Sequence, residues 1–60
     1  MTRRVREIYV REGSDGWHAV VAVELAGARR IEHAGPFLTA WEACGVAACA
    51  DREPLEPDER

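Results

Sequence analysis

Apolar residues alternate with a period of two along residues 17–26. The odd positions of this segment are all apolar, whereas the even positions are mixed and include His18 and Glu24. A period of two is typical of a β-strand, and the face made only of apolar side chains is the one that should meet a helix. The residues of that face are Trp17, Ala19, Val21, Val23 and Leu25.

A first strand is predicted before it, over residues 4–12. Simple alternation places Ile8 and Val10 on one face of this strand, and Val5 and Tyr9 on the other. The alternation is imperfect, because charged residues interrupt both sets. Both faces of this strand should therefore be partly covered.

Turn sequences separate the predicted strands. Residues 13–16 read Gly-Ser-Asp-Gly, which joins the first two strands at hairpin spacing, and Gly27 marks a second turn. The third strand is predicted over residues 28–34 and has Ile31 as its only large apolar residue, so it suits a sheet edge. Pairing should stop at Pro36, because proline has no N–H to donate to a ladder.

The helix start is marked by Thr39 and Glu42, which have the spacing of a capping box. In that motif the threonine hydroxyl accepts a hydrogen bond from the glutamate N–H, and the glutamate side chain reaches back to the threonine N–H. A helix is therefore predicted over residues 40–51, with Phe37 and Leu38 entering the core just before it. This helix is apolar on nearly every side, which a single three-stranded sheet cannot cover.

These elements predict an α+β fold, a three-stranded antiparallel sheet of order 1-2-3 packed by one C-terminal helix. A single domain should span residues 1–53. Residues 54–60 are rich in Pro, Asp and Glu and should form a disordered acidic tail.

The chain has only 60 residues. A chain of this size buries only about 60% of its extended surface, so a second subunit would add to a small core. The apolar helix and the weak, charged third strand, with its free edge groups, would each leave surface open to another copy. We therefore expect a homodimer, formed through the helix around Gly45, Val46 and Cys49 or through edge strands.

The cysteine pattern predicts a cytoplasmic protein. Cys44 and Cys49 are five positions apart, which places them about 140° apart around the predicted helix, so they should remain reduced. The N-terminal residues lead into charged positions and predict no secretory signal. No apolar run approaches the roughly 18 residues that a membrane span needs, so no membrane partner is expected.

The chemistry-bearing residues predict neither catalysis nor a metal site. His18 and His33 would be neighbours in an antiparallel sheet, but zinc sites are typically built on close-spaced ligand pairs, and the sequence has none. Cys44 is placed in the middle of the helix, away from the helix N-terminus that activates a thiol. We expect a protein that is not an enzyme and that uses no cofactor.

The arginine residues suggest nucleic acid as a second type of partner. All eight basic residues are arginine, against eleven acidic residues, for a net charge of −3. Small arginine-bearing sheets bind nucleic acid in some families, and the candidate contacts here are Arg4, Arg6, Arg29 and Arg30. The acidic balance opposes this alternative, because nucleic-acid-binding domains are usually basic.

The turn and the capped helix carry a resemblance. The segment 9–20, followed by Gly-Pro-Phe-Leu-Thr-Ala-Trp-Glu-Ala at 35–43, resembles the HicB-type antitoxin domain, in which a Gly-rich turn and an aromatic-led strand precede a helix with the pattern T-x-x-E-A. It also resembles the arm-type DNA-binding domain of tyrosine integrases and short uncharacterised bacterial domains of the same layout. The chain lacks the lysines of the integrase arm, and its Leu25-Ala26-Gly27 only approximates the leucine-proline-glycine of HicB.

The expected function is therefore a non-catalytic small protein-interaction module. An inhibitor or antitoxin-like protein that blocks a macromolecular partner fits this description. This class covers proteins encoded by a host, a plasmid or a phage, and it includes inhibitors of the anti-CRISPR type. The alternative is a nucleic-acid-binding module that uses the arginine-bearing sheet face. The candidate partner interface is formed by Glu42, Gly45, Val46 and Cys49.

Overall fold

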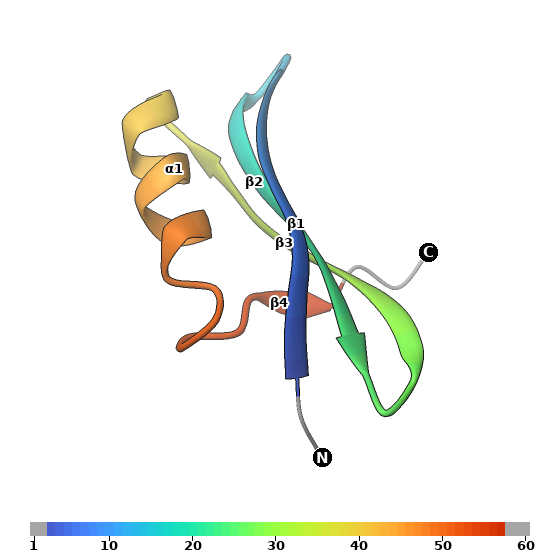
Figure 1. Ribbon diagram of the computed structural model, residues 1–60. Coiled ribbons are helices and arrows are strands. Elements are labelled where there is room, and N and C mark those ends of the chain that lie inside the picture. The colour runs from blue at the N-terminus through green and yellow to red at the C-terminus, as the bar shows by residue number, and fades with distance from the viewer. Residues whose placement is uncertain (1–2, 58–60) are drawn as a thin grey trace.

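The computed structural model describes residues 3–57, which form four β-strands and one α-helix. The strands form one antiparallel sheet in the order β1-β2-β3-β4, and α1 lies across one face of it (Figure 1). The predicted α+β class, the antiparallel sheet and the packed helix are confirmed. The bounds are β1 Arg3–Gly13, β2 Gly16–Leu25, β3 Ala28–Phe37, α1 Ala40–Ala48 and β4 Glu56–Pro57.

A β-bulge at Arg6 changes which residues of β1 face the helix. The register with β2 shifts between Val5 and Glu7, so one extra residue lies in β1 at this point. Val5 consequently packs with the core on the helix side of the sheet, the same side as Ile8 and Val10. The predicted placement of Val5 on the opposite face is wrong, because simple alternation does not detect an inserted residue.

A second bulge lies in β3, where Gly35 and Pro36 stand opposite the single residue His18. Beyond it Trp17 pairs with Phe37, so the ladder continues past the proline. The prediction that pairing stops at Pro36 is wrong, because the bulge takes the proline nitrogen out of the ladder. Gly35 has a φ of 137°, and a Cβ there would lie 2.8 Å from the Trp17 carbonyl oxygen, so this bulge requires glycine.

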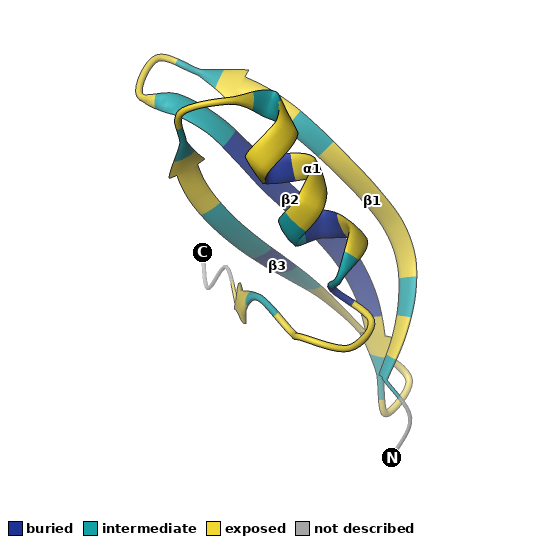
Figure 2. Ribbon diagram, turned by 90° about the vertical axis from the view of Figure 1, so that its left-hand side faces the viewer, coloured by how far each residue is buried: buried dark blue, intermediate teal, exposed yellow. Residues whose placement is uncertain are grey.

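The core lies between α1 and the odd-numbered residues of β2, as the alternation predicted. The fully buried residues on the helix side are alanines, and their short side chains allow the helix backbone to lie close to the sheet, while Val46 packs at the margin of the core. Figure 2 shows the buried residues as a band along β2 and on the facing side of α1. The buried residues are Ala19, Val21 and Val23 from β2, and Ala43, Ala47 and Ala50 from the helix and the turn after it.

The even-numbered face of β2 is buried as well, although α1 lies on the other side. Val20 is 6% exposed and Ala22 is 1% exposed. Both side chains are short, and their cross-strand neighbours on the same face, Tyr9, Ile31 and His33, are longer. The flanking side chains therefore cover the centre of this face within one copy of the chain.

The start of α1 follows the predicted cap only in part. The Thr39 hydroxyl accepts a hydrogen bond from the N–H of Glu42 at 3.2 Å, as predicted. The Glu42 carboxylate, however, accepts a hydrogen bond from the Thr39 hydroxyl at 3.3 Å instead of reaching the Thr39 N–H. The helix ends at Ala48, before the predicted end at residue 51, and the N–H of Cys49 turns back to the Val46 carbonyl oxygen at 3.2 Å.

The fourth strand lies within the segment that the sequence predicted as a tail. Glu56 pairs with His33, and Pro57 pairs with Glu32. Leu55, just before the strand, packs against both clusters of core residues. The sheet therefore has four strands and not the predicted three, and β4 lies along β3, the strand predicted to be an edge. Residues 58–60 of the predicted tail lie outside the described residues.

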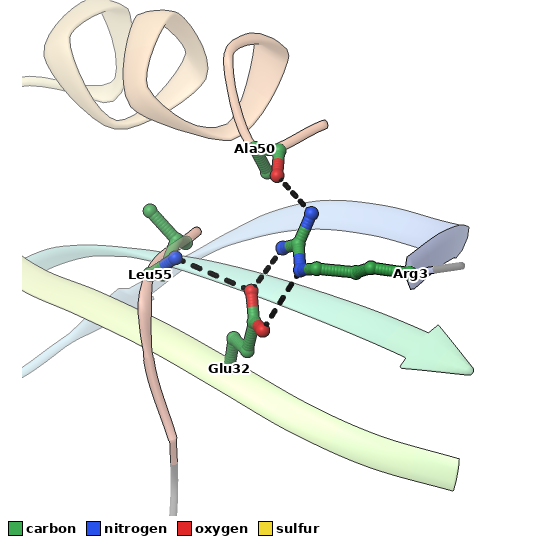
Figure 3. Close-up of polar contacts among 4 residues, drawn as sticks. All are labelled: Arg3, Glu32, Ala50 and Leu55. Carbon is green, nitrogen blue, oxygen red and sulfur yellow. Dashed lines mark hydrogen bonds and ion pairs between the residues drawn. The ribbon is translucent and has the colours of Figure 1, made fainter. Parts of the chain in front are cut away.

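A buried ion pair joins four separate parts of the chain (Figure 3). Glu32 is 3% exposed, and its carboxylate accepts two hydrogen bonds from the Arg3 guanidinium, one of them from Nε at 3.1 Å. Arg3 also donates to the carbonyl oxygen of Ala50, and the N–H of Leu55 donates to Glu32 at 3.2 Å. The pair thus connects β1, β3, the end of the helical region and the segment that leads into β4.

Replacing Arg3 by methionine should destabilise the protein by about 3 kcal/mol, because it leaves the Glu32 carboxylate buried without its counter-charge. Urea unfolding followed by tryptophan fluorescence measures the change. Arg4→Met is the matched control, since Arg4 is exposed on the same strand, and it should change stability by less than about 0.5 kcal/mol. Equal effects of the two substitutions would show that the buried pair contributes nothing specific.

Candidate functional site

A groove of about 450 Å³ lies between α1 and the chain segment that follows it. It contains all four residues of the predicted partner interface, and most of its other lining residues are apolar. The structure therefore brings these four residues together on one concave surface. The groove is lined by Phe37, Glu42, Gly45, Val46, Cys49, Glu53, Pro54 and Leu55.

The groove exists because the chain reverses direction after the helix. The carbonyl oxygen of Cys49 accepts hydrogen bonds from the N–H of Arg52 at 3.0 Å and from the N–H of Glu53 at 2.7 Å, which folds this segment into a tight turn. Glu42 lies in the first turn of α1, whereas Glu53 follows the last. The two carboxylates therefore lie toward opposite ends of an otherwise largely apolar surface.

Gly45 opens the wall of the groove. A Cβ added at this glycine would have no atom within 4 Å, so none of the described residues approaches it closely. Glycine in a helix interior costs up to about 1 kcal/mol relative to alanine. Nothing within the described part of the chain uses the space that this glycine leaves, which makes it available to another molecule.

A second apolar surface adjoins the groove at the start of the helix. Leu38 is 91% exposed and Trp41 is 86% exposed. The surface beside Trp41 continues through Cys44 to Gly45. The prediction that Leu38 enters the core is wrong: the residue that would pack on it in a hydrophobic staple is Ala43, which is too small and is itself buried against β2.

The four candidate nucleic-acid contacts do not form one basic surface. Arg4 and Arg29 lie opposite Glu24 on its two sides, on the face away from α1. Arg30 lies opposite Val23, on the helix face, and Arg6 is the bulged residue of β1.

Acidic side chains interrupt the arginines on that face. A weak, exposed ion pair also joins Arg29 to Glu7 at 3.6 Å. The residues Arg6, Glu7, Glu24 and Arg29 line one shallow depression. The local charge of this face is therefore mixed.

The two histidines are neighbours and form a hydrogen-bonded chain with Asp15. His18 Nε2 lies 2.7 Å from Asp15 Oδ1, and His18 Nδ1 lies 2.7 Å from His33 Nε2. In the neutral form, His18 donates to the carboxylate through Nε2 and accepts from His33 at Nδ1. The hydrogen bond from His18 lowers the pKa of Asp15, and the nearby charges of His18 and Arg11 act in the same direction. This chain joins the first hairpin turn to β3.

The described residues contain no further recognisable chemical centre. No group of three His, Cys, Asp or Glu side chains within residues 3–57 is arranged to hold a metal ion. Cys44 is exposed and Cys49 is half-buried, and both are free thiols. Within residues 3–57, no helix has both the length and the apolar character needed to cross a membrane.

Comparison of the chain with protein-family models, with curated proteins and with solved structures finds no match. The geometry of the molecule is therefore the basis for a functional proposal.

Replacing Asp15 by asparagine should reduce stability near neutral pH but have little effect in acid. When folding lowers the pKa of a carboxyl group, the ionised group stabilises the folded protein. This contribution is complete at pH values above the pKa of the unfolded state, 3.8 for an ordinary Asp. It is lost as the pH falls through the lower pKa of the folded state. Thermal unfolding of both proteins at about pH 7 and about pH 3 measures the difference. A difference that does not shrink in acid would contradict the assignment.

Proposed function

We propose that this protein is a non-catalytic interaction module that binds a protein partner through the groove along α1. The observation that carries the proposal is the apolar surface formed by the groove and by Trp41 beside it. Scattered exposed apolar residues are ordinary on proteins, but a contiguous apolar surface with a concave centre is typical of an interaction site. Gly45 lies at the junction of its two parts.

The charges around the groove define the partner. Glu42 and Glu53 lie toward its two ends, and Phe37, Val46 and Leu55 supply apolar lining. A complementary segment would carry an apolar anchor side chain flanked by Lys or Arg, because opposite charges at the rim guide association and fix the orientation of the bound segment. A net charge of −3 favours such a basic target.

A small acidic protein that occupies a basic surface of its target would act as an inhibitor. We propose an antitoxin-like or anti-CRISPR-type inhibitor, encoded by a host, a plasmid or a phage, that acts in the cytoplasm. The resemblance of the turn and capped helix to HicB-type antitoxin domains supports this class. The two free thiols are compatible with a reducing compartment.

The alternative function is nucleic-acid binding through the face of the sheet away from α1. Arg4 and Arg29 are both exposed on that face. Glu7 and Glu24 lie among these arginines, and the ion pair to Glu7 occupies Arg29, which weakens the case. Binding of this kind would fall steeply as salt is raised, because each phosphate contact releases counterions. A gel-shift titration across salt concentrations separates this alternative from the main proposal.

Two substitutions at Gly45 test the groove without disturbing the core. Gly45→Ala and Gly45→Arg should both raise stability, by up to about 1 kcal/mol, because each replaces a helical glycine at an open position. Gly45→Arg should nevertheless weaken partner binding by at least about tenfold, because it fills the groove and places a positive charge where a basic partner binds, whereas Gly45→Ala should bind normally. Capture from source-cell extract with each variant, followed by titration of the recovered partner, measures both effects.

Val46→Glu is a poorer test, because Val46 also packs against the core residues Ala19, Ala43 and Ala47. Loss of binding in that variant would not separate a damaged groove from a damaged fold. A partner that binds wild type, Gly45→Ala and Gly45→Arg equally well would place the interaction elsewhere and contradict the proposal.

A further inference from the structure

β1 is the longest open edge of the sheet within the described residues, since the opposite edge is covered by β4 at Glu32 and His33. It pairs with β2 on one side, and on its other side no strand of residues 3–57 is placed. Ile8 is 49% exposed and Tyr9 is 51% exposed at the middle of this edge. A long edge strand with unpaired N–H and C=O groups is a template for another strand, and most proteins block such an edge.

The sequence of this edge is complementary to itself about Tyr9. On the regular side of the bulge at Arg6, residues 7–11 read Glu-Ile-Tyr-Val-Arg, so in an antiparallel pair centred on Tyr9 each charged residue meets the opposite charge and each apolar residue meets an apolar one. Opposite charges and apolar pairs in cross-strand positions stabilise a sheet, and like charges destabilise it. The pairs are Glu7 with Arg11, Ile8 with Val10, and Tyr9 with its own copy.

We propose that two copies of this chain join through β1, in antiparallel pairing about a two-fold axis at Tyr9, to form one continuous eight-stranded sheet. The occupant of the β1 edge is thus a second copy of the same protein. Residues directly opposite each other in an antiparallel pair share a face of the sheet. The two-fold axis must therefore lie where one residue is directly opposite its own copy in the second chain. It runs perpendicular to the sheet, so both helices lie on the same side of the joined sheet.

Neighbouring registers are much less favourable. An axis at Ile8 would place Glu7 opposite Tyr9 and Arg11 opposite Val5, and one at Val10 would place Glu12 opposite Ile8. Each of these contacts sets a charge against an apolar side chain. The register centred on Tyr9 is the one in which residues 7–11 match throughout.

A second observation supports this dimer independently of the charges. A largely apolar depression of about 390 Å³ lies between β1 and α1, and its lining includes Ile8, Val10, Cys44 and Ala48. This depression borders the edge at which the second copy joins. The two-fold axis brings the two depressions toward each other on the helix side of the sheet, so dimer formation would cover apolar surface that one copy leaves open.

Two charge reversals test the register. In Glu7→Arg the new arginine would lie opposite Arg11 of the other copy. In Arg11→Glu the new glutamate would lie opposite Glu7 of the other copy. Because the dimer is symmetric, each repulsion between like charges occurs twice. Each variant alone should therefore dissociate at least about tenfold more readily than wild type. An equimolar mixture of the two variants restores opposite charges at both positions and should form a heterodimer close to wild type in affinity.

Analytical ultracentrifugation of the wild type, of each variant and of the mixture measures these associations. Arg30→Glu is the matched control for the change of charge, because Arg30 is exposed on β3 and far from β1 in strand order, and it should dimerise normally. Circular dichroism of each variant checks the fold, which matters for Glu7→Arg because it also removes the exposed ion pair to Arg29.

A wild-type protein that remains a 6.7 kDa monomer at high micromolar concentration would overturn the proposal. So would a dimer that neither reversal weakens, or a mixture that associates no better than its components. The Gly45 variants should dimerise like wild type, so failure of the β1 dimer and failure of the groove as a partner site are distinguishable.

Discussion

The position of both chain ends depends on the buried contact between Arg3 and Glu32. Glu32 lies buried on the helix side of β3, and a carboxylate buried there costs several kcal/mol unless it is paired and hydrogen-bonded. The compensating donors come from Arg3 on β1 and from the N–H of Leu55, while Arg3 also reaches the carbonyl of Ala50. An arrangement with either end placed elsewhere would leave this carboxylate without its partners.

The core beside that polar contact is made of small side chains. The helical region contributes alanines to the core, while the larger residues Leu38 and Trp41 remain in solvent. Burial of an alanine yields much less free energy than burial of a leucine or tryptophan. The largest apolar side chains near α1 are thus placed where a second molecule can reach them, which links the way this fold is stabilised to the proposed interaction function.

Local signals allowed much of the fold to be predicted. The alternation around Val21 located β2 and its core face, and the spacing of Thr39 and Glu42 located the start of α1. The bulges at Arg6 and at Gly35-Pro36 were missed, because an inserted residue shows itself only in the pairing between strands. β4 was missed because its stability comes from Leu55 and Glu32, which are distant in sequence, and not from the propensity of Glu56 and Pro57.

The candidate site was predictable to a similar extent. The helical periodicity predicted one set of residues on the same side of α1, and the structure brings them together: Glu42, Gly45, Val46 and Cys49. Phe37 and Leu55, which complete the groove from other parts of the chain, were not predicted. The self-complementary sequence around Tyr9 is visible in the chain itself. Its meaning depends on β1 being an edge of the sheet, which the predicted strand order 1-2-3 already implied and the structure retains.

Hydrogen exchange of the backbone amides of residues 6–12 tests most directly the claim that this protein acts through surfaces its own core leaves open. In a single copy, only alternate amides of an edge strand point to a neighbouring strand, so protection should alternate. NMR exchange at high protein concentration should show protection at every amide of this segment, with the alternate set losing protection on dilution. Alternating protection that does not change with concentration would contradict the account.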